Sequence, residues 1–366
     1  MSRIAHALRG NPLLWLLAAV PAVFVTEHVA PESHTALFVL AVLAIVPLAA
    51  LLSHATESVA AKTGDAIGGL LNATLGNLTE LVIAITALRA GMYDLVKASI
   101  AGAIVTNSLF MLGMALLLGG LRFRTQEYNP GTARLQSGML FLAAVALVVP
   151  SALGGSDRPG ADTIVQSLSL GLAVLLLVTY VLGLVYSLGT HRDFFASAGG
   201  GAQPEDEEHL WPVGVAVGML AAVTVIVALV SEIFVESVQY AALSFGMTPA
   251  FVGFVVVAIV GAAAEMTAAF SAARKNRLDL SIGIALGSSS QIALFVAPVL
   301  VLLSLVIGPT PMDLQFWPGA VVMVMFSTLA VLFLANSGRS SWYLGVMLLV
   351  VYATFAMTLY LLPPLG

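Results

Sequence analysis

Two glutamates, Glu80 and Glu265, lie deep inside long apolar stretches of the sequence. Each is about thirteen to fifteen residues into its stretch, which is on the order of 20 Å along a helix that rises about 1.5 Å per residue. An ionised carboxylate at that depth in a bilayer costs at least about 2.5–3.5 kcal/mol. A proton or a bound cation removes this cost, so the two positions predict a site that holds one or the other.

The composition predicts that these residues lie in a membrane. Of 366 residues, 60% are hydrophobic and 9% are charged, and the mean hydropathy is +1.02. A soluble domain carries roughly 25% charged residues, so a soluble enzyme, a nucleic-acid-binding protein and a disordered scaffold are excluded. The apolar runs are continuous and of transmembrane-helix length rather than alternating, which excludes a β-barrel. The sequence therefore predicts an all-α polytopic membrane protein.

Breaks rich in glycine and proline divide the chain into about eleven expected transmembrane helices. The expected spans are 12–29, 36–54, 67–89, 95–119, 135–153, 163–188, 211–237, 250–273, 279–307, 316–335 and 342–362. With a cytoplasmic N-terminus and an external C-terminus, eleven of the fourteen Lys and Arg residues fall on the cytoplasmic side, as the positive-inside rule expects. The first run lacks a clear cleavage site and is expected to be a retained helix.

An internal repeat relates the two halves of the chain. Glu80 precedes Asn107 by 27 residues, and Glu265 precedes Gln291 by 26. The predicted orientation sends the two glutamate-bearing spans in opposite directions, so the repeats are inverted, an arrangement typical of secondary transporters with a site at the repeat interface. The expected divisions are an N-terminal peripheral helix, a first five-helix repeat, a Gly-rich acidic cytoplasmic linker and a second five-helix repeat, at residues 1–30, 31–188, 189–210 and 211–366.

Neutral oxygen donors accompany the two glutamates. They are amides and a hydroxyl inside the apolar runs: Asn77, Asn107, Ser288 and Gln291. Calcium accepts six to eight oxygen ligands of these kinds, whereas the chain has no cysteine and no histidine beside either glutamate, which disfavours a zinc or soft-metal site. We therefore predict a divalent cation site in which Glu80 and Glu265 also carry protons. The simpler interpretation is hydrogen bonding between packed helices.

Three further acids lie nearer the ends of the expected spans. Glu57 is near the cytoplasmic end of its span, and Glu232 and Glu236 are near the outer end of theirs. The sequence around Glu57 recurs around Glu236, so these acids are candidate gates through which ions or protons reach the centre from opposite sides. Alternatively, they are solvated helix ends.

Several motifs resemble one known family. The stretch 68–81, GGLLNATLGNLTEL, and the stretch 280–295, LSIGIALGSSSQIALF, closely resemble segments of the calcium/proton exchangers, the CAX family of the calcium/cation antiporter superfamily. The second signature departs from the family pattern, because 261–266 reads GAAAEM where the family usually has GNAAEH. Ala262 and Met266 thus replace an amide and an imidazole, which leaves the choice of cation open.

This resemblance implies a ten-helix core of inverted repeats plus one peripheral helix, and the exchange of cytosolic Ca²⁺ for external protons without an enzymatic cofactor. The expected partners are Ca²⁺, protons and the lipid bilayer, with no nucleic acid; a homo-oligomer is left open. A prokaryotic plasma membrane is the expected location. The alternatives are another cation/proton or Na⁺/Ca²⁺ antiporter on the same fold, or a passive cation channel. The motifs of an intramembrane protease or a retinal protein are absent from the sequence.

Overall fold

The computed structural model describes residues 12–63, 65–153, 161–190 and 210–361. The acidic run of the expected linker lies outside these ranges. The first half contains η1 (Pro12–Ala18), α2 (Ala19–Val29), α3 (His34–Ala60), α4 (Asp65–Leu75), α5 (Leu78–Arg89), α6 (Tyr93–Val105), η2 (Thr106–Met111), α7 (Leu112–Phe123), β1 (Thr125–Glu127), α8 (Pro130–Leu153), α9 (Ala161–Leu184) and η3 (Val185–Thr190). The second half contains α12 (Val213–Ser244), α13 (Pro249–Phe251), η4 (Val252–Val257), α14 (Ala258–Gly261), α15 (Ala263–Arg274), α16 (Leu278–Gln291), η5 (Ile292–Val296), α17 (Ala297–Ile307), α18 (Pro318–Leu334), β2 (Arg339–Ser341) and α19 (Trp342–Leu361).

The fold is mostly helical, as predicted, and most of its helices are apolar. Within the described ranges, seven helices are long and apolar enough to cross a membrane, and two bent pairs raise this number to nine. Two shorter apolar helices, Trp15–Val29 and Pro318–Leu334, account for the remaining expected spans. The count of eleven transmembrane helices therefore stays a prediction that depends on these shorter helices.

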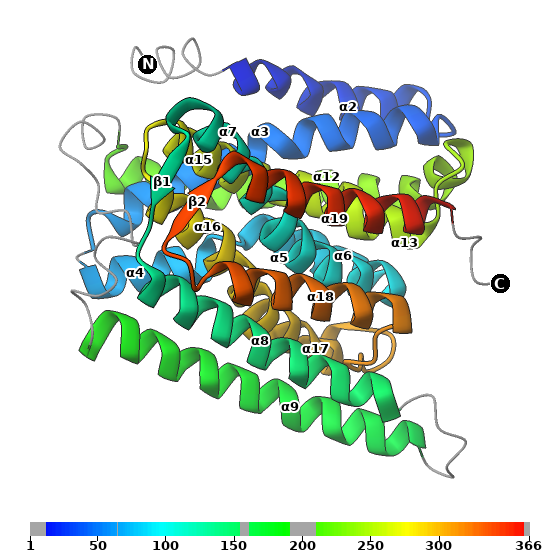
Figure 1. Ribbon diagram of the computed structural model, residues 1–366. Helices are drawn as coiled ribbons and strands as arrows, with labels where there is room; N and C mark the ends of the chain where they lie inside the picture. The colour runs from blue at the N-terminus through cyan, green and yellow to red at the C-terminus, as the bar shows by residue number, and fades with distance from the viewer. Residues whose placement is uncertain (1–11, 64, 154–160, 191–209, 362–366) are drawn as a thin grey trace.

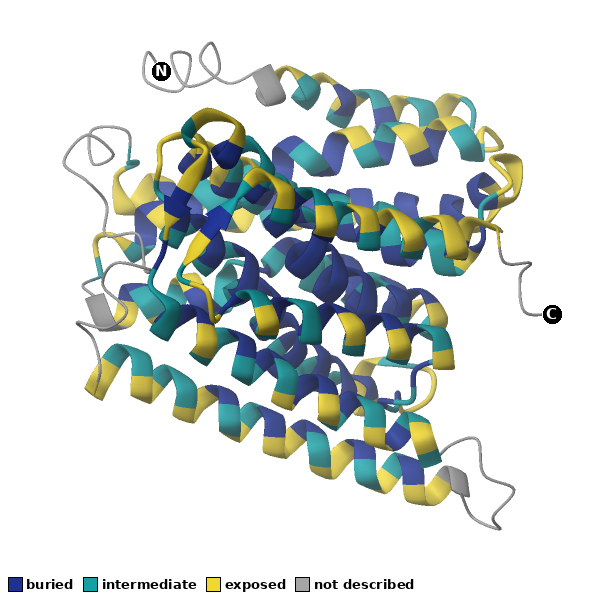
Figure 2. Cartoon of the chain, in the orientation of Figure 1, coloured by how far each residue is buried: buried dark blue, intermediate teal, exposed yellow. Residues whose placement is uncertain are grey.

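The helices surround a buried interior. In Figure 1, α8 and α9 lie along one side of the molecule and α2 and α3 along the opposite side, with α5, α6 and α16 between them. Figure 2 shows that this interior is mostly buried, whereas α2 and α9 carry exposed residues along their outer faces. Many of the exposed residues of α9 are large and apolar, including Val174, Leu175 and Val178. Such a surface suits contact with lipid rather than with water.

Two of the inner spans are broken near their middles. Helices α4 and α5 meet at an angle of 42°, and the segment Pro249–Gly261 meets α15 at 60°. The residues at the two breaks have similar backbone conformations: Asn77 has φ −95° and ψ 26°, and Ala262 has φ −82° and ψ 8°. A glycine, Gly76 or Gly261, immediately precedes each break, and the conformational freedom of glycine permits a local departure from helical geometry.

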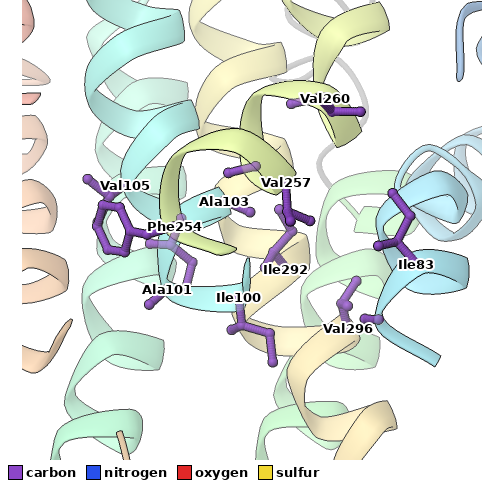
Figure 3. Close-up of a cluster of buried hydrophobic side chains, with 14 of the residues drawn as sticks. Ile83, Ile100, Ala101, Ala103, Val105, Phe254, Val257, Val260, Ile292 and Val296 are labelled. Atoms are coloured by element: carbon purple, nitrogen blue, oxygen red, sulfur yellow. The ribbon is translucent and has the colours of Figure 1, made fainter. Parts of the chain in front are cut away.

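Close packing in the interior brings the two halves of the chain together. Phe254 of η4 lies against the segment of α6 that contains Ala101 and Val105, with Val257 and Ile292 nearby (Figure 3). A Cβ atom at Gly102 would lie only 2.3 Å from the carbonyl oxygen of Phe254. The backbones of α6 and η4 can therefore approach only because residue 102 is glycine, a common device in membrane helices.

This contact predicts a stability difference between two glycine substitutions. Gly102→Ala forces α6 and η4 apart and should lower the free energy of unfolding by about 1–3 kcal/mol, which is typical of an overpacked core. Gly171→Ala in α9 is the matched control, because nothing lies within 4 Å of its added Cβ. The stability of both variants is compared by the midpoint of thermal unfolding in detergent. Equal midpoints for the two variants would contradict the close approach.

Candidate cation site

Both central glutamates lie in the first turn of the second half of a broken span. Glu80 is in the first turn of α5, and Glu265 is in the first turn of α15. The N-terminus of a helix carries a partial positive charge and unpaired N–H groups, which favour a nearby carboxylate. The breaks thus place two helix N-termini inside the protein, each beside a glutamate.

The two glutamates come together because α14 approaches α5 closely. A Cβ atom at Gly261 would lie 2.8 Å from Cγ of Glu80 and 3.3 Å from its Oε1. The Glu80 side chain therefore packs on the glycine just before the second break. Glu80 and Glu265 are near enough for their charges to interact. The structure thus brings into one buried region two carboxyls that are 185 positions apart in the chain.

The four predicted neutral ligands form one hydrogen-bonded chain. Asn77 Nδ2 donates to Gln291 Oε1 at 2.5 Å, and Ser288 Oγ donates to Asn77 Oδ1 at 2.8 Å. Asn107 Nδ2 donates to Ser288 Oγ at 2.9 Å. Ser288 also lies near the carboxyl of Glu265, so the chain of polar groups ends close to the glutamate pair.

Irregular helix turns accompany this network. Asn107 lies in the π-helical segment η2, and Gln291 directly precedes the π-helical segment η5. Wide turns of this kind are rare and frequently occur at functional sites. Here they interrupt the two buried spans that supply the amides opposite the broken helices.

Three buried oxygens at this site have no hydrogen-bond donor among the described residues. They are Oε1 of Glu80, Oε2 of Glu265 and Oδ1 of Asn107. The oxygens of Asn77 and Gln291, by contrast, already accept hydrogen bonds. A buried acceptor without a partner is costly. A proton would satisfy either carboxyl oxygen, and a cation would satisfy all three oxygens. Within the described ranges no three His, Cys, Asp or Glu side chains cluster, so a cation here would rely on two carboxylates and neutral oxygens.

The structure shows two polar residues near the site that the sequence interpretation missed. Gln136 of α8 has a buried Oε1 without a described partner, and its carbonyl accepts a hydrogen bond from Ser290 at 3.2 Å. Tyr180 OH donates to the carbonyl of Ala73 near the end of α4 at 2.9 Å. Tyr180 interrupts an apolar run and was detectable on that ground, whereas Gln136 lies at the start of an expected span and resembles an ordinary helix end.

The three candidate gate acids lie elsewhere. Glu57 on α3 and Glu232 and Glu236 on α12 are all exposed. The Ser53 hydroxyl donates to Glu57 Oε1 at 3.3 Å, and Arg89 Nη1 lies 4.0 Å from Glu232 Oε1. An exposed ion pair of this length contributes little to stability. The gate roles of these acids stay a prediction.

Comparison with known proteins identifies the family. The family model described as sodium/calcium exchanger protein matches residues 33–189 and 215–361, which together make up most of the chain. The chain belongs to this exchanger family. The resemblance seen in the sequence motifs is thereby confirmed, and the protein is an integral membrane transporter rather than an enzyme.

Relatives of this exchanger match it over most of their length. A Ca²⁺/H⁺ antiporter from Synechocystis is 40% identical, with 98% of this chain and 99% of the relative covered. The Ca²⁺/H⁺ antiporter ChaA from Bacillus subtilis is 38% identical, with 89% of this chain and 92% of the relative covered. The solved structure of native YfkE has a TM-score of 0.82 and 33% identity, covering 96% of this exchanger and all of that chain.

The contact between Gly261 and Glu80 predicts a specific effect on cation binding. Gly261→Ala should push the Glu80 carboxyl out of place and weaken divalent cation binding roughly 10–100-fold, because displacements of about 1 Å in a preorganised site have effects of this size. Gly138→Ala is the control, since its added Cβ meets nothing within 4 Å. Isothermal titration calorimetry in detergent, with thermal unfolding as a check of folding, measures both. Wild-type affinity in folded Gly261→Ala would contradict this geometry.

Proposed function

We propose that this exchanger is a Ca²⁺/H⁺ antiporter that exports cytosolic Ca²⁺ in exchange for external protons by alternating access. The observation that carries the proposal is the pair of adjacent carboxyls, each with one buried oxygen that has no described partner. The relatives named as Ca²⁺/H⁺ antiporters support the choice of ions.

The pair couples the two ions because it cannot hold both at once. Two protons neutralise Glu80 and Glu265, and one Ca²⁺ neutralises the same two charges after the protons leave. The ionised, empty pair is unfavourable in this apolar interior, because like charges repel and the medium solvates them poorly. If the site switches between the two sides of the membrane only when it is neutral, it crosses with either two protons or one Ca²⁺ bound. Protons then move in one direction and Ca²⁺ in the other, which is antiport.

The oxygens around the pair suit a hard cation. Asn107 Oδ1 is available as a third ligand beside the two carboxylates, and the Ser288 hydroxyl lies near Glu265. Calcium's flexible shell of six to eight oxygens is completed by waters in many proteins. Asn77 and Gln291 hold the network in place through their own hydrogen bonds. The absence of an amide at Ala262 makes the two halves of the site unequal.

The inverted repeat explains how one site is reached from two sides. The two breaks with similar backbone conformations support a repeat relation between residues 31–188 and 211–366, and so does the match of the family model to both halves. Rocking of one bundle about the central pair would open the site alternately. Glu57 would then receive ions on the cytoplasmic side and Glu236 on the outer side, with Glu232 held beside Arg89.

The orientation follows from the distribution of basic residues. A cytoplasmic N-terminus and an external C-terminus place eleven of the fourteen Lys and Arg residues in the cytoplasm. The bacterial relatives support a prokaryotic plasma membrane. In this orientation the antiporter uses the inward proton gradient to remove Ca²⁺ from the cell.

Calcium uptake into proteoliposomes with an imposed pH gradient tests the proposal. The wild-type chain should take up ⁴⁵Ca²⁺ only when protons move the opposite way, and Glu80→Gln and Glu265→Gln should each abolish uptake, because Gln keeps the volume of the side chain and removes its charge. Glu27→Gln on the exposed face of α2 is the matched control and should transport normally.

Other outcomes separate the alternatives. Uptake that ignores the pH gradient and runs only downhill would indicate a channel. Uptake driven by a sodium gradient instead would indicate a Na⁺/Ca²⁺ antiporter. Normal transport by folded Glu80→Gln or Glu265→Gln would remove that residue from the site.

A further inference from the structure

A basic cavity lies between α7 and α15, apart from the cation site. Its volume is about 430 Å³, and its cationic lining residues are Arg122, Arg274 and Lys275. Among the residues that the structure describes, no acidic side chain lines it, and none of its three cations forms an ion pair. A cavity of this charge attracts an anion and repels Ca²⁺.

The cavity lies on the face of α15 that points away from the interior of the protein. The face of α15 that packs into the protein consists of Met266, Ala269, Ala272 and Ala273. Thr267, Ser271 and Arg274, which line the cavity, are exposed. At about 100° of rotation per residue they lie roughly opposite Glu265 on the helix. The cavity is therefore not a branch of the route to the glutamates but faces the surroundings of the protein.

The lining of the cavity changes from charged to apolar along the two helices. Arg122 Nη1 donates to the carbonyl of Arg274 at 3.0 Å, so the C-terminal ends of α7 and α15 lie together. Leu118 and Phe270, one helical turn before Arg122 and Arg274, are partly buried and also line the cavity. The cationic groups thus surround the end of the cavity, and the apolar groups lie about 5 Å farther from the helix ends.

A simpler role for the basic residues is to stabilise helix ends. Cations near a helix C-terminus interact favourably with its partial negative charge, and the hydrogen bond from Arg122 to Arg274 is of this kind. That role requires neither a cavity nor hydroxyl groups. Here Ser271 supplies a hydroxyl on the cavity wall, one turn before Lys275 on the same face of the chain, whereas the Thr267 hydroxyl donates to the carbonyl of Ala263 at 2.9 Å.

We propose that this cavity binds an anionic phospholipid. The phosphate would lie among Arg122, Arg274 and Lys275, and the first carbons of an acyl chain would lie against Leu118 and Phe270. A zwitterionic lipid is a poorer match, because its ammonium group would face three cations. Free phosphate would leave the apolar residues uncovered. Helix α15 also carries Glu265. A bound lipid would therefore contact the exposed face of a helix whose opposite face contributes to the cation site.

Native mass spectrometry of the full chain, stripped of lipid in detergent, tests this assignment. The wild type should bind one phosphatidylglycerol molecule in preference to phosphatidylcholine. Arg274→Gln and Lys275→Gln should each weaken phosphatidylglycerol binding about fivefold, since a basic residue near an anionic lipid surface contributes about 1 kcal/mol, and should leave phosphatidylcholine binding unchanged. Arg274→Lys keeps the charge and should retain binding. Lys62→Gln, an exposed charge on the same predicted side, is the matched control.

Three results would overturn the proposal. Equal losses in Lys62→Gln and Lys275→Gln would mean diffuse attraction rather than a site. Displacement of the lipid by millimolar inorganic phosphate, with Phe270→Ala binding normally, would mean a simple anion site. Equal binding of phosphatidylcholine and phosphatidylglycerol by the wild type would mean that the cavity does not select an anionic lipid. Thermal unfolding of each variant checks that the fold is intact.

Discussion

The structure depends on one electrostatic constraint: two carboxyls lie together inside an apolar helical protein, and no described Lys or Arg forms an ion pair with either. Such a pair is tolerated when it is neutral. A protein with a fixed counter-charge at this place would keep the carboxylates ionised without help from outside. Without such a counter-charge the pair is neutralised by protons or by a bound cation, and in the proposed function these are the ions that enter and leave.

The fold supports this constraint through its broken helices. Breaks at Asn77 and Ala262 place two helix N-termini beside Glu80 and Glu265, which moderates the repulsion between the carboxylates without removing it. Gly261 lets α14 touch Glu80. The network through Ser288 then fixes the surrounding amides in one orientation. In the proposed function these features prepare the site for a cation, and its charge is balanced when a cation or protons are bound.

Much of this site was predictable from sequence because burial of an acid is visible as an interruption of an apolar run. Glu80, Glu265 and the four neutral ligands interrupt such runs, and the structure brings all six together. The sequence could not show that the oxygens of Asn77 and Gln291 are occupied while Asn107 Oδ1 is not, because hydrogen-bond partners depend on how helices from two halves pack. Gln136 and the basic cavity were missed for the same reason: they depend on the neighbouring helix, not on the local pattern. The helical stretches themselves were predictable, because their length and hydropathy are local properties.

The central claim is that protons and Ca²⁺ compete for the same two carboxyls. Calorimetric titration of the detergent-purified chain with Ca²⁺ in buffers of different ionisation enthalpy measures the protons released per ion bound. The account predicts a release that approaches two protons per Ca²⁺ as the pH is lowered, one from each of Glu80 and Glu265, with about one fewer in Glu80→Gln if that variant still binds Ca²⁺. Calcium binding to the wild type without proton release at any pH would contradict it.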